Sequence, residues 1–297
     1  MDMLENMRAF LAVAEAKSFT AASDSLGLAV SVVTKRVSQL EDAVGVELLT
    51  RTTRKVSLSP EGEYHRSRIS EVVSRYDDAI SAIRKGSAQL EGLIRIKVPT
   101  VLGIVHLNSI IKKFIEANPL VDVEILLRDG PFDPKSENID IAITAFPETY
   151  DEVIDHYLWP LTSKLVASPT YFENHDLPEH PRDLAKHRCI VYQPTRESWA
   201  FIGPSGPITV LVHARLMSND MNILFSAAMD GMGIGLLTTY VVQEALEEGK
   251  LVEVLAGYPT PDRWVKAVIP KERATLPRIA ALLNYLKDNP VFSRKFG

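Results

Sequence analysis

Residues 18–63 read SFTAASDSLGLAVSVVTKRVSQLEDAVGVELLTRTTRKVSLSPEGE, and this stretch decides the fold of the N-terminal part of the chain. Between residues 33 and 44 apolar side chains recur every three or four positions. Gly45 follows them, so a helix is predicted that ends at this glycine. A shorter helix is predicted over 21–26, with Thr20 as its N-cap. Two helices separated by so short a turn must cross steeply, as they do in a helix-turn-helix.

The residues on either side complete a small domain. An apolar stripe at helical spacing predicts a first helix over 4–16. After the helix-turn-helix, short β-like runs over 46–49 and 56–58 flank a basic cluster over 51–55, which is the pattern of a wing tip. The order of three helices and a hairpin predicts a winged helix-turn-helix.

Polar and basic residues gather on the two parts of this domain that a DNA duplex would meet. The exposed N-terminal half of the second helix of the pair is cationic and rich in hydroxyl groups, with no acid before Glu41, and the 51–55 cluster holds three cations and no acid. Such side chains suit phosphate oxygens and base edges in a major groove. Two positive charges on the helix alone would fit a solvated face equally well. The candidate DNA-binding residues are Thr20, Ser31, Thr34, Lys35, Arg36, Ser38, Arg51, Thr52, Thr53 and Arg54.

The net charge of −5 does not exclude a DNA partner, because it is unevenly distributed. Residues 1–90 hold 12 basic and 12 acidic residues, so the whole deficit lies in the remainder of the chain. A neutral N-terminal part beside an acidic C-terminal part fits a local basic footprint.

A proline-led helix follows the wing. Ser59 can cap it and Pro60 suits its first turn, so a long helix is predicted over 60–86. Its apolar stripe predicts pairing with the same helix of a second copy; the alternative is packing on the C-terminal part of its own chain. The residues of this stripe are Ile69, Val72, Val73, Tyr76, Ile80 and Ile83.

From residue 92 onward the pattern alternates between strands and helices, which predicts a parallel α/β sheet with ligand sites at the carboxyl ends of its strands. The first units are a strand over 93–98, a helix over 99–118, and strands over 121–127 and 139–145. Further strands are predicted over 164–167, 189–192, 208–212, 234–237 and 264–269, and helices over 222–229, 239–247 and 276–288.

Composition and motifs exclude several functions. At 297 residues and 46% hydrophobic content the chain can bury the cores of about two domains. Cys189 is the single cysteine and is expected in a core, so neither a disulfide nor a metal or cofactor site is expected. No G-x-S-x-G or H-E-x-x-H motif occurs, and the glycine run over 231–235 lacks the third glycine of a dinucleotide fingerprint. The N-terminus carries charges and no stretch approaches a membrane span, so a cytoplasmic protein, not an enzyme, is expected.

Five landmarks in order give the chain a specific resemblance. They are Ser18–Ala22, Leu40–Glu41, Gly45–Val46, Arg51–Arg54 and Leu58–Gly62. The stretch resembles the N-terminal domain of LysR-type transcriptional regulators.

The sequence departs from the family pattern at Ala29 and Val30. An alanine cannot cap, which costs about 0.5–2 kcal/mol unless Ser31 substitutes. Val30 and Val32 either contact a thymine methyl or close the turn.

The resemblance implies an α+β multidomain protein that binds double-stranded promoter DNA as a dimer or larger oligomer, with RNA polymerase as a further possible partner. The implied domains are a winged helix-turn-helix (1–59), a dimerisation helix (60–86), a connector (87–91) and an effector-binding domain (92–297). That domain would resemble periplasmic binding proteins, with lobe I over 92–162 and 265–297 and lobe II over 163–264. The alternative is a cytoplasmic binding or transport-type protein without DNA function.

The same resemblance implies a small-molecule effector between the lobes. Thr100 at a helix N-terminus favours an anionic group such as a carboxylate. Ser218 and Asn219 could equally cap the helix that follows them. The candidate effector-binding residues are Pro99, Thr100, Val101, Thr144, Ala145, Phe146, Gln193, Thr195, Ser218 and Asn219.

Overall fold

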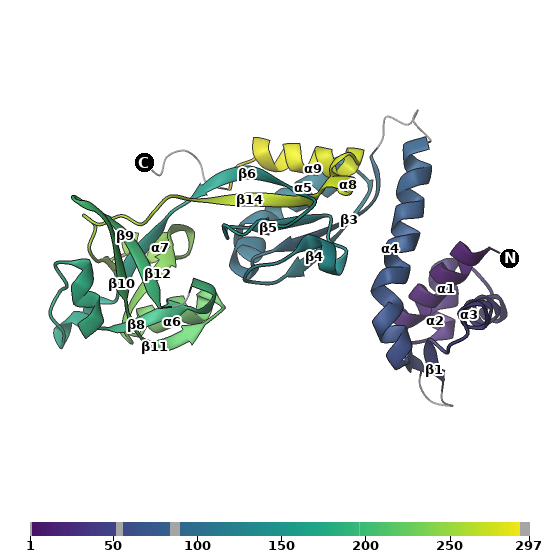
Figure 1. Ribbon diagram of the computed structural model, residues 1–297, viewed down its shortest axis with the longest axis horizontal. Coiled ribbons are helices and arrows are strands. Elements are labelled where there is room, and N and C mark those ends of the chain that lie inside the picture. Colours follow the sequence, from purple (N-terminus) through teal and green to yellow (C-terminus); the bar gives the residue numbers. More distant parts are fainter. Residues whose placement is uncertain (1, 52–55, 84–89, 196, 292–297) are drawn as a thin grey trace. The chain divides into compact units, whose positions relative to one another are not determined.

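The computed structural model describes residues 2–51, 56–83, 90–195 and 197–291. It divides into two compact units, Met1–Ala88 and Gln89–Gly297 (Figure 1). Within the described ranges, no helix combines the length and apolar character needed to cross a membrane.

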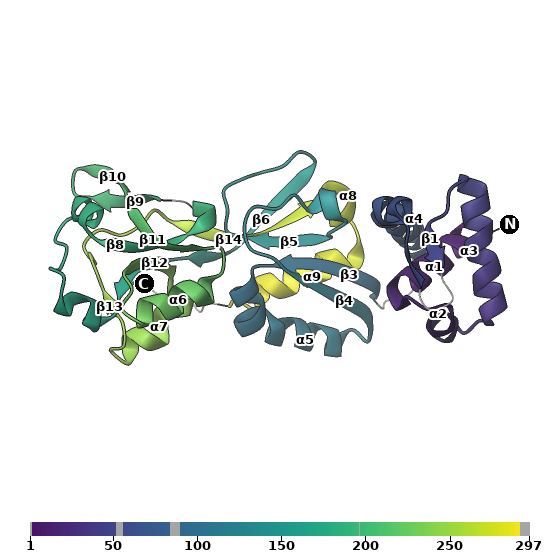
Figure 2. The ribbon, with the colours of Figure 1, turned by 90° about the horizontal axis from the view of Figure 1, so that it is seen from below.

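The N-terminal unit is a helical domain with a small hairpin. Helices α1 (Met3–Ala16), α2 (Phe19–Leu26) and α3 (Val30–Val44) pack against one another (Figure 2). Their core includes Phe10 and Leu40. The antiparallel strands β1 (Leu49–Arg51) and β2 (Val56–Leu58) follow. The predicted winged helix-turn-helix fold is confirmed, and the tip of its wing lies outside the described residues.

The caps of α2 and α3 correct the predicted Thr20 cap and confirm that Ala29 leaves α3 without a side-chain cap. Helix α2 begins two residues earlier than predicted, so Ser18 and not Thr20 is its N-cap, and the Ser18 hydroxyl accepts from the Ala21 backbone nitrogen at 3.3 Å. Ala29 precedes α3 and no side chain caps this helix, so Ser31 does not substitute for a cap.

The long helix α4 (Pro60–Ile83) is held to the hairpin at its first turn. The Ser59 hydroxyl accepts from the Gly62 backbone nitrogen at 2.9 Å, which confirms the predicted cap. A Cβ atom on Gly62 would lie 2.0 Å from the Leu48 carbonyl oxygen. The helix start therefore approaches the backbone before β1 so closely that only glycine fits there.

The apolar stripe of α4 has two parts, and the first packs on the core of its own N-terminal unit, which was neither of the two arrangements expected from the sequence. Ile69 packs against the core of the N-terminal unit and Val73 is buried, because α1 lies alongside this part of α4. Val72 and Tyr76 are about half exposed, at 49% and 48%. Of the remaining stripe positions, Ile80 is half-buried and the side chain of Ile83 lies outside the described set.

The C-terminal unit contains two five-stranded sheets, and each has helices packed on it. The first sheet has the order β4-β3-β5-β14-β6, with strands β3 (Glu91–Val98), β4 (Leu120–Leu127), β5 (Ile141–Thr144), β6 (Val153–Leu161) and β14 (Arg263–Pro270). Its helical segments are the π-helix η1 (Leu102–Leu107), α5 (Asn108–Ala117), the 3-10 turn η2 (Pro134–Glu137), α8 (Lys271–Ala274) and α9 (Pro277–Asp288).

The second sheet has the order β11-β8-β12-β7-β13. Its strands are β7 (Ser163–Ala167), β8 (Arg188–Tyr192), β11 (His213–Ser218), β12 (Ile234–Thr238) and β13 (Val252–Glu253). Its helical segments are η3 (Pro169–Glu173), η4 (Pro181–Lys186), η5 (Gln193–Thr195), α6 (Met221–Met229) and α7 (Thr239–Glu247). Strands β9 (Ser198–Gly203) and β10 (Gly206–Leu211) form a separate two-stranded hairpin, whose Trp199, Phe201 and Val210 pack into the core of the second sheet.

The first three strands form the predicted parallel arrangement, but both sheets also contain antiparallel strands, so both are mixed. Strands β3, β4 and β5 are parallel, but β14 is antiparallel to both β5 and β6, and β7 is antiparallel to β12 and β13. The reason is the path of the chain: it leaves the first sheet through β6 and re-enters it through β14. The two sheets therefore share two connections, and the space between them is the site described below.

Candidate DNA-binding surface and ligand pocket

The side chains on the exposed N-terminal part of α3 make few contacts with other elements of the N-terminal unit. Ser31 and Lys35 are exposed, and Lys35 has no carboxylate within ion-pair distance in the described part of the chain. The Thr34 hydroxyl donates to the Val30 carbonyl at 2.8 Å, one turn back. Val30 and Val32 are also exposed. This end of α3 is therefore a free surface with one available cation.

Arg36 is engaged within its own unit. Its guanidinium lies 2.8 Å from a carboxylate oxygen of Glu5 in α1. Because this ion pair is partly exposed, it contributes little to stability, but it directs the side chain toward α1.

Glu41, near the end of α3, connects this helix to the start of the hairpin through its carboxylate. One of its carboxylate oxygens accepts from the backbone nitrogens of Leu48 and Leu49, at 2.9 and 3.0 Å. The other lies 2.5 Å from the guanidinium of Arg51, which also stacks over the Phe19 ring at 5.1 Å. Arg51 thus joins α2, α3 and β1, so it acts in the packing of the domain as well as on its surface.

The remaining candidates of this surface differ in what the structure shows of them. Thr20 is exposed in α2, and Ser38 is half-exposed in α3. Thr52, Thr53 and Arg54 lie outside the described residues. The assignment of all ten residues to DNA stays a prediction.

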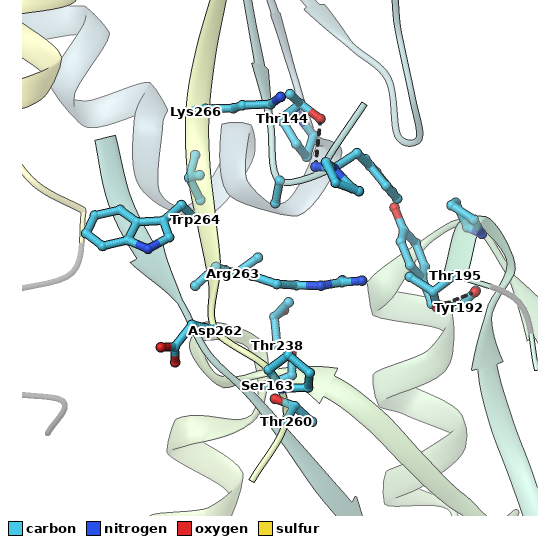
Figure 3. Close-up of a pocket in the computed structure, with 18 of the residues that line it drawn as sticks. Thr144, Ser163, Tyr192, Thr195, Thr238, Thr260, Asp262, Arg263, Trp264 and Lys266 are labelled. Atoms are coloured by element: carbon cyan, nitrogen blue, oxygen red, sulfur yellow. Dashed lines mark hydrogen bonds between the residues drawn. The ribbon is translucent and has the colours of Figure 1, made fainter. Parts of the chain in front are cut away.

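A cavity of about 670 Å³ lies between the two sheets of the C-terminal unit (Figure 3). Six of the ten predicted effector residues line it, namely Pro99, Val101, Thr144, Ala145, Phe146 and Thr195. They come from the end of β3, the end of β5 and the turn after β8, so the carboxyl ends of three strands converge here, as the sequence predicts.

The other four predicted residues lie outside the cavity lining. The Thr100 hydroxyl and backbone nitrogen both donate to Asp129. Ser218 accepts from the backbone nitrogen of Asp220, and it is Asp220, not Ser218 or Asn219, that caps α6. Gln193 begins η5 beside the lining residues Tyr192 and Pro194 but is not among them.

Two cations face the cavity, and only one is neutralised by a described neighbour. Lys266 is buried, and its ammonium lies 2.7 Å from Asp155 and 2.8 Å from the Glu148 carbonyl oxygen. Arg263 extends across the cavity toward Tyr192 (Figure 3). No carboxylate of the described residues lies within ion-pair distance of its guanidinium. Arg263 is therefore the cation available to a ligand.

Aromatic side chains supply the apolar wall. Phe146 and Tyr192 stack with their ring centroids 6.3 Å apart, one from each side of the cavity. Burial raises the pKa of Tyr192 and raises the pKa of Tyr240 to about 12. Both phenols therefore stay protonated at neutral pH and can donate hydrogen bonds.

Sequence reasoning missed Arg263, Lys266, Tyr192, Tyr240 and Asp129. Arg263 lies directly before the predicted strand over 264–269, and Lys266 lies within it. The two residues are three positions apart, so strict alternation would place them on opposite faces of the strand, and a register shift between Val265 and Lys266 interrupts that alternation. The roles of Asp129 and Tyr240 depend on which loop lies beside which strand, so no local pattern reveals them.

A winged helix-turn-helix unit joined to a two-lobed α/β unit with a polar cavity defines a class of protein, the ligand-responsive transcription regulators. A family profile described as "Bacterial regulatory helix-turn-helix protein, lysR family" matches residues 4–63, and one described as "LysR substrate binding domain" matches residues 87–290. The chain therefore belongs to the LysR family of transcriptional regulators, with a DNA-binding and an effector-binding domain. This family consists of regulators rather than enzymes, and a transport-type function is not favoured.

Individual relatives are similar to this chain over nearly its full length. The chain is 31% identical over 290 residues to the HTH-type transcriptional regulator PtxR of Pseudomonas aeruginosa, which covers 96% of this chain and 92% of PtxR. It is similar in structure to CrgA, a LysR-type transcriptional regulator from Neisseria meningitidis, at 25% identity and a TM-score of 0.61 over 96% of this chain and 97% of CrgA. The Vibrio cholerae virulence activator AphB shares the fold at 24% identity, with a TM-score of 0.63 over 96% of this chain and 99% of AphB.

Proposed function

We propose that this regulator senses a small anionic molecule in the cavity between its two sheets, and that Arg263 binds the anionic group. The observation that carries the proposal is the guanidinium of Arg263, an exposed residue that lines the cavity and has no ion-pair partner among the described residues, whereas the other cation there, Lys266, is bound to Asp155. A charge-assisted hydrogen bond to such a group contributes about 1.5–3 kcal/mol. The aromatic pair of Phe146 and Tyr192 would contact the apolar part of the ligand.

The anionic group would then lie at Arg263 and not at the helix start at Thr100. Asp129 occupies that helix start and would repel a second carboxylate there. The predicted preference for an anion is kept, but its support is Arg263 and not the helix N-terminus.

Calorimetry with a panel of small carboxylates and their neutral amides tests the site. We expect Arg263→Ala to weaken carboxylate binding by about tenfold or more, while binding of the amides changes little. Arg182→Ala removes an equal charge at an exposed position of η4, outside the cavity lining, and serves as the matched control. Equal losses for acids and amides, or no loss for either, would contradict the assignment.

We further propose that α4 pairs with α4 of a second copy, so that two DNA-binding units meet one promoter duplex and the ligand alters their arrangement. The exposed pair Val72 and Tyr76, one helical turn apart, supports this. Light scattering on Val72→Glu/Tyr76→Glu should show a smaller assembly, whereas an unchanged mass would contradict it.

The proposed domain limits are 1–59, 60–86, 87–91 and 92–297, with a cytoplasmic location. Contact with RNA polymerase stays a prediction.

A further inference from the structure

Two valines at the start of α3 are exposed, although other valines of this helix form the core. Val30 and Val32 are 40% and 39% exposed, whereas Val33 and Val37 are fully buried. The exposed pair therefore does not close the turn, which was one of the two alternatives the sequence allowed. Exposed single apolar residues are common, so their exposure alone does not indicate a contact with a partner.

The two valines lie where the second helix of a helix-turn-helix meets base edges. They are the first and third residues of α3, and Ser31 stands between them. Because successive helical residues are rotated by about 100°, Val30 and Val32 lie on opposite flanks of Ser31. Ala29, which precedes them, has a short side chain and makes no side-chain cap bond. This helix end is thus narrow, apolar on both flanks and unobstructed by a cap.

Charge on the same helix identifies the occupant. Lys35 is exposed one turn further along and has no ion-pair partner among the described residues, and no acidic residue precedes Glu41 in α3. A surface of one cation without a described partner, hydroxyl groups and no acid complements a polyanion such as the DNA backbone.

We infer that Val30 and Val32 read thymine bases through their 5-methyl groups. A valine side chain neither donates nor accepts hydrogen bonds, so it cannot recognise the polar edges of the other bases. In the major groove the thymine methyl is the apolar group that distinguishes a T·A pair. The inference rests on DNA binding by the N-terminal unit, and it names the base that this binding selects.

The test has two arms: one removes the thymine 5-methyl group from the DNA, and the other replaces the valines of the protein. The full-length chain selects its preferred duplexes from a library of randomised double-stranded DNA. The best duplex is then resynthesised with deoxyuridine at each thymine position in turn, which deletes only the methyl. Burial of one methyl-sized group corresponds to about a fourfold change in affinity. We expect such a loss at one or two thymines per half-site.

The variant Val30→Ala/Val32→Ala should bind the thymine duplex more weakly by at least this factor and should not distinguish deoxyuridine from thymine. Val44→Ala alters an exposed valine at the other end of α3 and is the matched control. Lys35→Ala should weaken binding to the thymine and deoxyuridine duplexes equally.

Wild-type protein that is indifferent to deoxyuridine at every position would overturn the inference without any variant. So would equal methyl sensitivity in the wild type and the double variant. If the chain selects no duplex, DNA binding itself fails, and the inference fails with it.

Discussion

Asp129 closes the start of the helix at Thr100: its carboxylate accepts from the Thr100 hydroxyl and, at 3.3 Å, from the Thr100 backbone nitrogen. The protein thus places its own anion at the helix end where the sequence suggests a ligand anion. An acidic residue at a helix N-terminus is stabilising, because it satisfies free N–H groups and complements the helix dipole.

Asp129→Ala should lower the free energy of unfolding by about 1–2 kcal/mol, because it removes an N-terminal cap. It should also strengthen carboxylate binding in the adjoining cavity, since a negative charge is lost there. Thermal unfolding and calorimetry measure the two effects. Weaker carboxylate binding with the fold intact would show that Asp129 contacts the ligand instead.

Lys97 provides a pH-dependent prediction. It is fully buried on β3, where its ammonium donates to the Gly130 carbonyl oxygen at 3.3 Å and lies 5.6 Å from the Phe132 ring centroid. Burial lowers the pKa of Lys97 to about 8. Below pH 8 the folded protein carries a buried charge. Between pH 8 and the ordinary lysine pKa of about 10.5, the folded state has lost a proton that the unfolded state still binds.

Stability relative to a Lys97→Met variant should therefore rise with pH across this window. We expect Lys97→Met to be more stable than the wild type at pH 7, by about 1–3 kcal/mol, because a buried charge is removed while one hydrogen bond is lost. The difference should shrink toward pH 10. Urea unfolding at both pH values gives the comparison, and a gap independent of pH would contradict the assigned ionisation.

Glu41 should be more important for folding than for DNA contact. Glu41→Ala leaves the backbone nitrogens of Leu48 and Leu49 and the Arg51 guanidinium without their shared partner. We expect the N-terminal unit to lose about 2–4 kcal/mol of stability. Exchange of the Leu48 and Leu49 amide hydrogens would report this locally. Asp42→Ala, one residue further on the exposed side of α3, is the control.

Gly62→Ala should be destabilising even though alanine favours helices. The added Cβ would lie 2.0 Å from the Leu48 carbonyl oxygen, so the first turn of α4 must move away from the hairpin. We expect a loss of about 1–3 kcal/mol. Ser67→Ala, at an exposed position of the same helix, should change stability little. A Gly62→Ala protein with an unchanged melting temperature would disprove this close approach.

The fold of the N-terminal unit could be predicted because its signals are local. The period of Val33, Val37 and Leu40 and the glycine after it lie within one helix. The ion pairs could not be predicted, because Arg36 meets Glu5 from another helix and Arg51 meets Glu41 ten residues away.

In the C-terminal unit some strands and contacts could not be predicted from the sequence, again for physical reasons. Strand β6 was missed because Asp155, His156 and Pro160 interrupt its apolar pattern, and strand β11 alternates with polar residues. The direction of β14 depends on pairing with β6, more than 100 residues earlier in the chain. The strand-end residues Thr144 and Phe146 could be placed in the cavity because strand ends are visible locally. Arg263 could not be identified as the free cation, because that depends on where Asp155 and Asp129 lie.

Arg263 is paired in register with Leu161, and these two residues stand where the chain crosses between the sheets in each direction. Both line the cavity. A ligand bound by Arg263 would thus act at the hinge between the two lobes and not at their outer edges. A small displacement at a hinge produces a larger displacement at the far end of each lobe. In this way even a very small metabolite could change the relative orientation of the two lobes.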